Sequence, residues 1–268
     1  MSMIAITDKE FAFFQRFIHE EAGITLSLAK KPLVCGRLGK RLNQHDFRSY
    51  TEYFNYLKSG QSPAEVQMAI DLLTTNETYF FREPKHFELL RELATAAKAR
   101  SQPFRVWSAA SSSGEEAYSI AMVLADCIPS NNWEIMGSDI SLRVLERARC
   151  GHYPMERTKH IPLHYLKRFC LRGIGEQEGT LLIERSLRSK VEFLQVNLNE
   201  KLPDLGKFDV IFLRNVMIYF NGETKQQIVA RVLSLLKPGG HFCIGHSESL
   251  NGISDAVQPI APSIYRNP

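Results

Sequence analysis

The sequence predicts an α/β fold in which a mostly parallel, doubly wound sheet follows an all-α domain and carries a small antiparallel insertion. Residues 104–139 read as strand, small-residue turn, helix and second strand, which is the opening of such a sheet. The same strand and helix rhythm resumes from Val191 to the end of the chain. The first 75 residues show only helical periodicity, so they are expected to form a separate helical domain.

The composition is that of an ordinary globular protein, with 268 residues, 44% hydrophobic and 23% charged. A net charge of +4 is too small to indicate nucleic-acid binding by itself. The five cysteines are scattered and never spaced as Cys-x-x-Cys, which favours reduced thiols in the cytoplasm and no structural metal. We find no signal-peptide pattern and no apolar run of about 18 residues, the length that would span a bilayer.

The helical domain has clear start signals. Ser/Thr-x-x-Glu capping boxes stand at Thr7–Glu10, Ser49–Glu52 and Ser62–Glu65, and each precedes an apolar helical pattern. Gly23 is placed to end the first helix, and a second helix is expected over residues 31–44. We therefore expect three capped helices and one that starts near a proline.

The second helix also carries a basic stripe. Residues 30–48 hold six basic side chains and one acid, and the stripe proper consists of Lys30, Arg37, Lys40, Arg41 and Arg48. One interpretation is a solvated helix face. The other is a docking surface for an acidic partner, such as an anionic helix or a nucleic-acid backbone.

The segment from Thr74 to Pro84 joins the two domains. It combines hydrogen-bonding side chains with three aromatic residues, whereas a plain linker is richer in Gly, Pro and Ser. We expect it to fold against the ligand crevice of the sheet. Pro84 then begins a helix that leads to the strand at Phe104.

The turn after the first strand departs from the dinucleotide-binding pattern. It lacks Gly-x-Gly-x-x-Gly, and Gly114 is followed by Glu115 and Glu116. Two carboxylates at a helix start repel a pyrophosphate but suit a cationic cofactor such as S-adenosylmethionine. Asp139, at the end of the second strand, can accept hydrogen bonds from ribose hydroxyls. The alternative is an α/β unit whose glutamates only favour the helix N-terminus.

Residues 151–190 leave the strand and helix rhythm. Short apolar runs at 169–171 and 180–184 flank a Gly-rich segment and predict a β-hairpin in an insertion. Its edge could accept an extended peptide, although a surface excursion without such a role is the default expectation. Strands are then expected at 191–196, 208–213 and 241–245, with a last antiparallel strand at 263–266.

Four motifs along the chain resemble a known family. They are Asn76-Glu-Thr-Tyr-Phe-Phe-Arg82, the segment Ser108–Ser119, Arg214-Asn-Val-Met-Ile-Tyr-Phe220 and Gly245-His-Ser-Glu248. Together they resemble the chemotaxis-receptor glutamate methyltransferases, the CheR family, in order and over nearly the whole chain. One departure is Ala117, where family members often have a proline.

This resemblance implies a Rossmann-like methyltransferase domain at residues 104–268, with the β-subdomain inserted at about 151–190. Residues 1–75 would be the receptor-docking domain, and 76–103 a linker and helix that contribute to the cofactor site. The implied reaction moves a methyl group from S-adenosylmethionine to glutamates on the cytoplasmic helices of chemoreceptors. Its products are glutamyl methyl esters and S-adenosylhomocysteine.

The resemblance also assigns residues. The implied cofactor-binding set is Asn76, Thr78, Arg82, Glu116, Asp139, Asn197, Leu198, Asn215 and Val216. We hypothesise that Arg82 orients the incoming carboxylate and that Tyr219 helps to place the methyl group. The structural alternatives are an interdomain salt bridge for Arg82 and a core position for Tyr219.

The basic stripe would steer the receptor helix, and the hairpin is the region where some members bind a receptor C-terminal peptide. We expect a cytoplasmic monomer recruited to receptor arrays, without nucleic acid, metal or membrane insertion. Two other functions stay open. One is a methyltransferase for RNA or a small molecule, although no Asn-Pro-Pro-Tyr-like motif is present. The other is a non-catalytic receptor adaptor.

Overall fold

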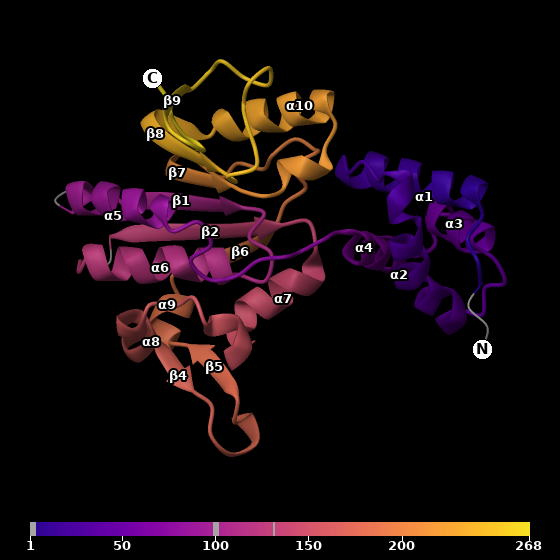
Figure 1. Ribbon diagram of the computed structural model, residues 1–268, viewed down its shortest axis with the longest axis horizontal. Helices are drawn as coiled ribbons and strands as arrows, with labels where there is room; N and C mark the ends of the chain where they lie inside the picture. The colour runs from indigo at the N-terminus through magenta and orange to yellow at the C-terminus, as the bar shows by residue number, and fades with distance from the viewer. Residues whose placement is uncertain (1–3, 99–101, 131) are drawn as a thin grey trace. The chain divides into compact units, whose positions relative to one another are not determined.

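A computed structural model describes residues 4–98, 102–130 and 132–268 of the chain (Figure 1). The chain forms two compact units. The first holds the residues up to Thr75 together with Tyr219–Lys225, and the second holds Asn76–Ile218 with Gln226–Pro268. The expected linker and helix of residues 76–103 belong to the second unit, although residues 99–101 lie outside the described residues.

The first unit is built from helices. They are α1 (Asp8–Ala22), η1 (Leu28–Lys30), α2 (Lys31–Gln44), α3 (Tyr50–Lys58) and α4 (Pro63–Leu73). Apolar residues at helical spacing are fully buried between them, among them Phe11, Phe14, Val34, Leu38, Leu42, Tyr50 and Tyr53. The short helix η4 (Met217–Tyr219) ends in this unit, where the Tyr219 carbonyl accepts the Thr25 N–H at 2.8 Å.

The capping boxes form to different extents. At Thr7 the box is complete, because Thr7 Oγ1 accepts the Glu10 N–H and the Glu10 carboxylate accepts the Thr7 N–H. Ser62 caps α4 in the same way through its hydroxyl, but the Glu65 carboxylate does not return to the cap. It turns into the interior and accepts hydrogen bonds from Arg41 Nε and Tyr53 Oη, both at 2.8 Å. A buried carboxylate requires such partners, so the interior network replaces the second half of the box.

The second unit contains a seven-stranded sheet in the order β6-β2-β1-β7-β8-β10-β9. Its strands are β1 (Phe104–Ala109), β2 (Trp133–Asp139), β6 (Val191–Gln195), β7 (Phe208–Leu213), β8 (Leu236–Ile244), β9 (Gln258–Ala261) and β10 (Ile264–Arg266). All neighbours from β6 to β8 pair in parallel, and β10 runs antiparallel to β8 and β9. The predicted mixed, mostly parallel sheet is confirmed.

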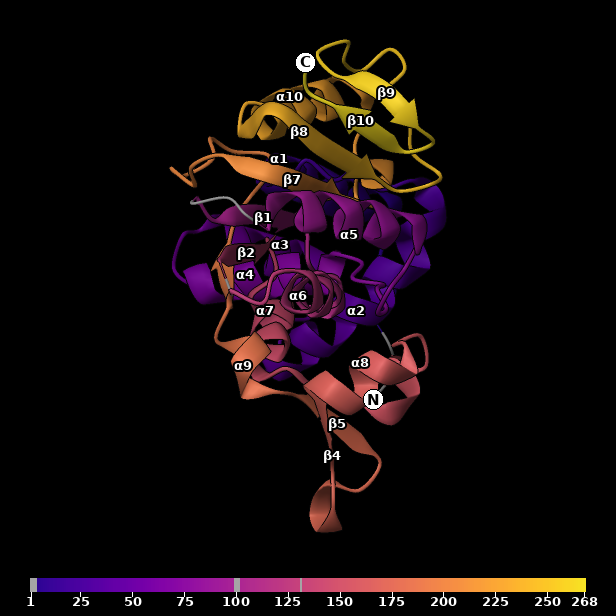
Figure 2. The same cartoon turned by 90° about the vertical axis from the view of Figure 1, so that its left-hand side faces the viewer.

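Helices α5 (Lys85–Ala97) and α6 (Glu115–Cys127) run along one face of this sheet (Figures 1 and 2). Their apolar sides and alternate strand residues form one buried cluster, which includes Leu90, Ala94, Ile120, Leu124, Phe104, Val106, Ile135, Val210 and Phe212. Helix α7 (Leu142–Cys150) follows β2, and α10 (Gly222–Leu233) precedes β8. Packing of these helices on the sheet fixes the central strands, and their carboxyl ends therefore lie in a defined arrangement.

The C-terminal part of the sheet differs from the prediction in detail. Strand β8 begins at Leu236, and its register with β7 shifts between Leu236 and His241. The extra residues include Pro238, which has no N–H to donate to a ladder and is therefore tolerated at such an irregularity. Strand β9 was not expected, because its sequence shows no apolar alternation. The absence of that signal agrees with the structure, where all four of its residues are exposed.

The insertion is a second, three-stranded antiparallel sheet in the order β3-β5-β4. Its strands are β3 (His152–Pro154), β4 (Cys170–Arg172) and β5 (Thr180–Ile183), with the short helices η2 (Met155–Thr158), α8 (Leu163–Phe169), η3 (Gly175–Gln177) and α9 (Arg185–Arg188). Pairing of β4 with β5 confirms the predicted hairpin. Strand β3 escaped prediction because three residues that end in proline carry little signal.

Within the residues that the structure describes, no helix combines the length and the apolar character needed to cross a membrane.

Candidate active site

The candidate site lies in the second unit, at the carboxyl ends of β1, β2 and β7. These strands are neighbours, and parallel strands end at the same edge of a sheet. Gly114 closes the turn after β1 with a φ of 94°. A Cβ atom there would lie 2.9 Å from Ala148 Cβ and 3.0 Å from Tyr153 Oη, so only glycine fits both the conformation and the space.

Asp139 fastens this turn to the end of β2. Its Oδ2 accepts the Ser112 N–H at 2.9 Å, and its Oδ1 accepts the Ser141 N–H at 3.0 Å. Two backbone donors, one on each carboxylate oxygen, restrict the rotation of this side chain. Asp139 is therefore held in one orientation at the predicted ribose position.

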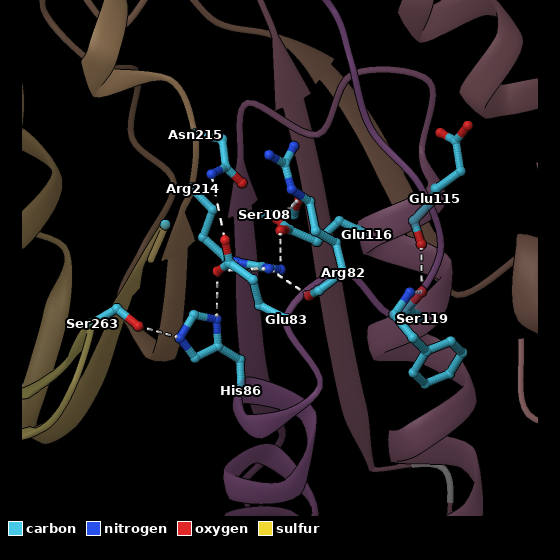
Figure 3. Close-up of polar contacts among 12 residues, drawn as sticks. Arg82, Glu83, His86, Ser108, Glu115, Glu116, Ser119, Arg214, Asn215 and Ser263 are labelled. Atoms are coloured by element: carbon cyan, nitrogen blue, oxygen red, sulfur yellow. Dashed lines mark hydrogen bonds and ion pairs between the residues drawn. The ribbon is translucent and has the colours of Figure 1, made fainter. Parts of the chain in front are cut away.

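A buried ion-pair cluster stands beside the turn (Figure 3). The Arg214 guanidinium, whose side chain is only 2% exposed, lies between two carboxylates. Its Nη1 is 2.8 Å from Glu116 Oε2, and its Nη2 is 3.0 Å from Glu83 Oε2. The Ser108 hydroxyl donates to the other oxygen of Glu116 at 2.6 Å. Glu116, predicted to contact the cofactor, is thus fixed by Ser108 of β1 on one oxygen and by Arg214, directly after β7, on the other.

Glu83 also orders the segment after β8. Its Oε1 accepts the His246 N–H at 3.1 Å and the Asn215 Nδ2 at 3.4 Å. Burial would raise the pKa of Glu83, but the Arg214 guanidinium and the His246 N–H outweigh it and hold this pKa below the usual value. Glu83 is therefore an ionised member of the cluster at neutral pH.

A third carboxylate, Glu248, is bound entirely by backbone donors. It accepts the N–H groups of Gly245, Asn215 and Met217 at 2.7, 2.9 and 2.8 Å. Asn215 has a φ of 58°, an uncommon conformation that these bonds stabilise. Glu248 therefore fixes the chain directly after Arg214, whose guanidinium has two carboxylate partners, Glu83 and Glu116. Two carboxylates on one guanidinium leave this ion-pair cluster with excess negative charge.

His86 closes the cluster on the side of α5. It is fully buried, its Nδ1 is 3.5 Å from Glu83 Oε2, and its Nε2 is 2.9 Å from Ser263 Oγ. Burial and the nearby Arg214 lower the pKa of His86 to about 3. His86, His246 and Glu83 bring possible metal-ligand atoms within 4.8 Å of one another. However, Arg214 already holds the shared Glu83 oxygen, and its positive charge opposes a divalent cation there.

Arg82 lies on a strained turn of the linker. Phe81 and Glu83, on either side of it, have φ values of 54° and 58°. The Arg82 guanidinium donates to the Glu77 carbonyl at 3.3 Å and lies 5.5 Å from the centre of the Tyr79 ring. Within the described part of the second unit it has no ion-pair partner. Its charge is therefore not neutralised there by a carboxylate.

The linker is tied to the sheet at several points. The Ser112 hydroxyl donates to the Asn76 carbonyl at 3.0 Å, and the Phe81 N–H donates to the Ser119 hydroxyl at 3.0 Å. The Arg214 guanidinium also donates to the Arg82 carbonyl. This confirms that the segment folds against the sheet instead of passing through solvent.

The sequence matches two family profiles. Residues 76–265 match "CheR methyltransferase, SAM binding domain", and residues 9–74 match "CheR methyltransferase, all-alpha domain".

The chain belongs to the CheR methyltransferase family. It is similar to the "Chemotaxis protein methyltransferase" of Escherichia coli strain K12, with 43% identity over 98% of this chain and 92% of that protein. It is 41% identical to "Chemotaxis protein methyltransferase 2" of Pseudomonas aeruginosa, over 97% of this chain and 93% of the relative. The "Chemotaxis protein methyltransferase" of Borreliella burgdorferi is 36% identical, over 98% of this chain and 95% of that protein. This CheR chain is accordingly a methyltransferase that uses S-adenosylmethionine.

The remaining predicted site residues of this CheR chain are local in their contacts. Asn197 follows β6, where its side chain accepts the Asn199 N–H and donates to Glu200, both at 3.0 Å. The next carbonyl, that of Leu198, accepts a hydrogen bond from Arg231. Val216 is half-buried after Asn215. Tyr219 belongs to the first unit. Its catalytic role stays a prediction.

The basic stripe on α2 divides into two groups. Arg37 donates to the Leu72 and Thr74 carbonyls at 3.0 and 2.8 Å, and Arg41 pairs with buried Glu65. These two arginines therefore have structural partners inside the helical unit. The other members of the stripe are exposed: Lys30, Lys40 and Arg48.

Sequence reasoning gave no role to Glu83 and Arg214, which build the cluster, or to Glu248, which holds the backbone after Arg214. Arg214 stands directly after the apolar strand β7, at the edge of the sheet where ligands of such folds bind, and this position is the signal that could have found it. Glu83 and Arg214 are 131 residues apart in the chain, so no local pattern could have paired them.

Proposed function

We propose that this CheR protein transfers methyl groups from S-adenosylmethionine to glutamate side chains of chemoreceptors. The products are glutamyl methyl esters and S-adenosylhomocysteine. The observation that carries the proposal is the cluster around Arg214, where one guanidinium after β7 has two carboxylate partners, Glu83 on the linker and Glu116 in the first turn of α6. A phosphate-bearing cofactor requires positive charge at this place, whereas a sulfonium and an ammonium group suit the excess negative charge.

The proposed cofactor-binding residues lie on the linker, on α6, at the end of β2 and after β6 and β7: Asn76, Thr78, Arg82, Glu116, Asp139, Asn197, Leu198, Asn215 and Val216. Asp139 would accept the ribose hydroxyls, and Glu116 would contact the methionine end. Asn197 and Leu198 would hold the adenine. Their strand-end positions support these assignments, because ligands of doubly wound sheets bind at that edge.

The bound cofactor supplies an electrophilic methyl group on its sulfonium. The receiving glutamate is ionised at neutral pH, so this chain need not provide a general base. Its residues must instead align the carboxylate and exclude water. Arg82 is the proposed orienting group, because its guanidinium lies on a preorganised turn without a carboxylate partner in its unit. Tyr219 is the proposed second catalytic residue, which helps to place the methyl group.

The helical domain is the proposed docking domain for the receptor. Methylation helices present acidic side chains, and the exposed Lys30, Lys40 and Arg48 offer complementary charge. Arg37 and Arg41 already have internal partners, so they would attract the receptor through their positive charge and would not bind it directly. We further propose a cytoplasmic monomer, recruited to receptor arrays by this docking and without nucleic acid. A receptor C-terminal peptide at the β4 edge would add a second contact.

The test is methyl transfer from methyl-labelled S-adenosylmethionine to a receptor cytoplasmic fragment. Glutamyl methyl esters are hydrolysed by mild base, so transferred label should be released as volatile methanol. A matched receptor fragment with its methylated glutamates changed to alanine should accept no label. Base-stable label would contradict ester formation.

The same assay separates the alternative functions. Total RNA and a small-molecule extract are added as competing acceptors, and label in either instead of the receptor would identify a different substrate class. Binding of S-adenosylhomocysteine and receptor without any turnover would identify an adaptor.

A further inference from the structure

The inserted β-subdomain reaches the candidate site through Arg157, which lies on η2. Arg157 Nη2 is 2.8 Å from Glu115 Oε1 in the first turn of α6 and donates to the Thr78 carbonyl at 3.0 Å. The Glu115 side chain is fully buried, while the Arg157 side chain is 37% exposed. One arginine thus joins the insertion, the linker and the helix that begins the cofactor site.

Two neighbouring contacts act on the same elements. The Tyr153 hydroxyl donates to the Ser113 carbonyl at 2.7 Å, and its ring meets Phe80 of the linker edge-on at 5.0 Å between centroids. The His160 ring lies 4.9 Å from the ring of Tyr79. The insertion therefore contacts the linker at Thr78 and at the two residues that follow it, and it also supports the turn after β1.

Glu115 depends on Arg157 for its charge. Burial raises the pKa of Glu115 above its usual value, and the Ser113 hydroxyl at 2.7 Å and the Arg157 guanidinium only limit this rise. Without Arg157, the carboxylate would have no cationic partner in a buried position, where an unpaired charge is costly. It would then take up a proton or move, and either change alters the first turn of α6.

We propose that Arg157 is a positioning residue of the cofactor site, which makes the β-subdomain part of the cofactor-binding architecture. By holding the Thr78 carbonyl and Glu115, it fixes the linker and the turn that presents Glu116, the neighbour of Glu115. The inference rests on the proposed use of Thr78 and Glu116 in binding S-adenosylmethionine. Loss of the Arg157 contacts should lower the affinity for the cofactor and leave the affinity for the receptor unchanged.

The first measurement is calorimetric titration with S-adenosylhomocysteine, which requires no receptor. Arg157→Ala should weaken this affinity about tenfold or more, and Arg157→Lys should recover part of the loss because it restores a cation. Arg185→Ala, an exposed arginine of the same insertion, is the matched control and should bind like the wild type. Thermal unfolding of each variant checks that it is folded.

Kinetics and a second variant separate positioning from general destabilisation. Arg157→Ala should raise the KM for S-adenosylmethionine and leave the receptor KM unchanged. In a Glu115→Gln background, which removes the buried charge, Arg157→Ala should cost less affinity than in the wild type. Equal loss in both backgrounds, or an affinity within twofold of the wild type, would overturn the proposal. Failure of the wild type itself to bind S-adenosylhomocysteine would instead refute the proposed function on which it rests.

Discussion

Arg214 Nη1 lies 2.8 Å from Glu116 Oε2, and this ion pair joins the end of β7 to the first turn of α6. The same guanidinium holds Glu83 at 3.0 Å, so the linker is fixed in the same network (Figure 3). Three segments that are distant in sequence are therefore aligned by one buried cation. In this CheR protein the cluster has two effects, since it fixes the site and leaves it negatively charged.

Replacing Arg214 by methionine should strongly destabilise the protein. The change keeps a long apolar stem but leaves Glu83 and Glu116 buried without their cation. Removing one partner of a buried ion pair costs about 3 to 5 kcal/mol of unfolding free energy. Urea unfolding should show this loss. Lys31→Met, which removes the exposed pair with Asp8, is the control and should change the midpoint little.

Arg82→Ala should lower catalysis much more than stability. Arg82 makes one carbonyl hydrogen bond and one ring contact, so unfolding free energy should fall by less than about 1 kcal/mol. Loss of carboxylate orientation should reduce kcat about 100-fold. Arg91→Ala is a contrasting control, because Arg91 pairs with Asp126 and should affect stability without affecting kcat. Parallel losses of stability and kcat in Arg82→Ala would assign Arg82 a structural role.

The sequence predicted those parts of the fold that depend on neighbouring residues. Gly114, the glutamates after it and the apolar strands beside it define the first strand, turn and helix within one segment. The site prediction relied on strand ends, which a sequence also shows directly. Asp139 is accordingly found in the turn network where its position at the end of β2 suggested.

The residues that escaped prediction have distant partners. Periodicity placed Arg41 on a polar helix face, but it could not show that Glu65, 24 residues later, would turn inward to meet it. Arg157 likewise lies in an insertion, 79 residues from the Thr78 carbonyl that it binds. A local sequence pattern identifies the polar face of a helix or a helix cap. The tertiary fold decides which charged side chain pairs with the residues there.

His86 should make folding stability pH-dependent. Its pKa of about 3 in the folded protein lies below the usual value of 6.5, so between these values the unfolded chain binds a proton that the folded chain does not. Stability should therefore fall as the pH drops below about 6.5, by about 2 kcal/mol at a pH of about 5. The charged and titratable groups that face His86 are Arg214, Glu83 and His246. Glu83 does not oppose the trend, because its lowered pKa affects stability only at more acidic pH.

The measurement is urea unfolding of the wild type and of His86→Gln at pH values of about 7 and 5. Glutamine keeps an amide that can bond to Ser263 but cannot titrate. The wild type should lose stability between the two pH values, and His86→Gln should lose about 2 kcal/mol less. His152→Gln is the control, because His152 is exposed and should leave the pH dependence unchanged. An identical slope in wild type and His86→Gln would assign the acid sensitivity to other groups.

Receptor binding should depend on salt through the exposed basic residues of α2 and its flanks. Attraction between exposed charges is screened within about 10 Å at 0.1 M salt, so the receptor KM should rise with ionic strength. The triple variant Lys30→Ala/Lys40→Ala/Arg48→Ala should raise the KM about tenfold at low salt and flatten its salt dependence. The KM for S-adenosylmethionine should stay constant, because these residues belong to the helical unit. A second triple variant, Arg147→Ala/Arg185→Ala/Lys201→Ala, removes the same net charge from exposed positions of the other unit. If both triple variants shift the receptor KM equally, the attraction arises from total charge and the stripe on α2 is not a docking surface.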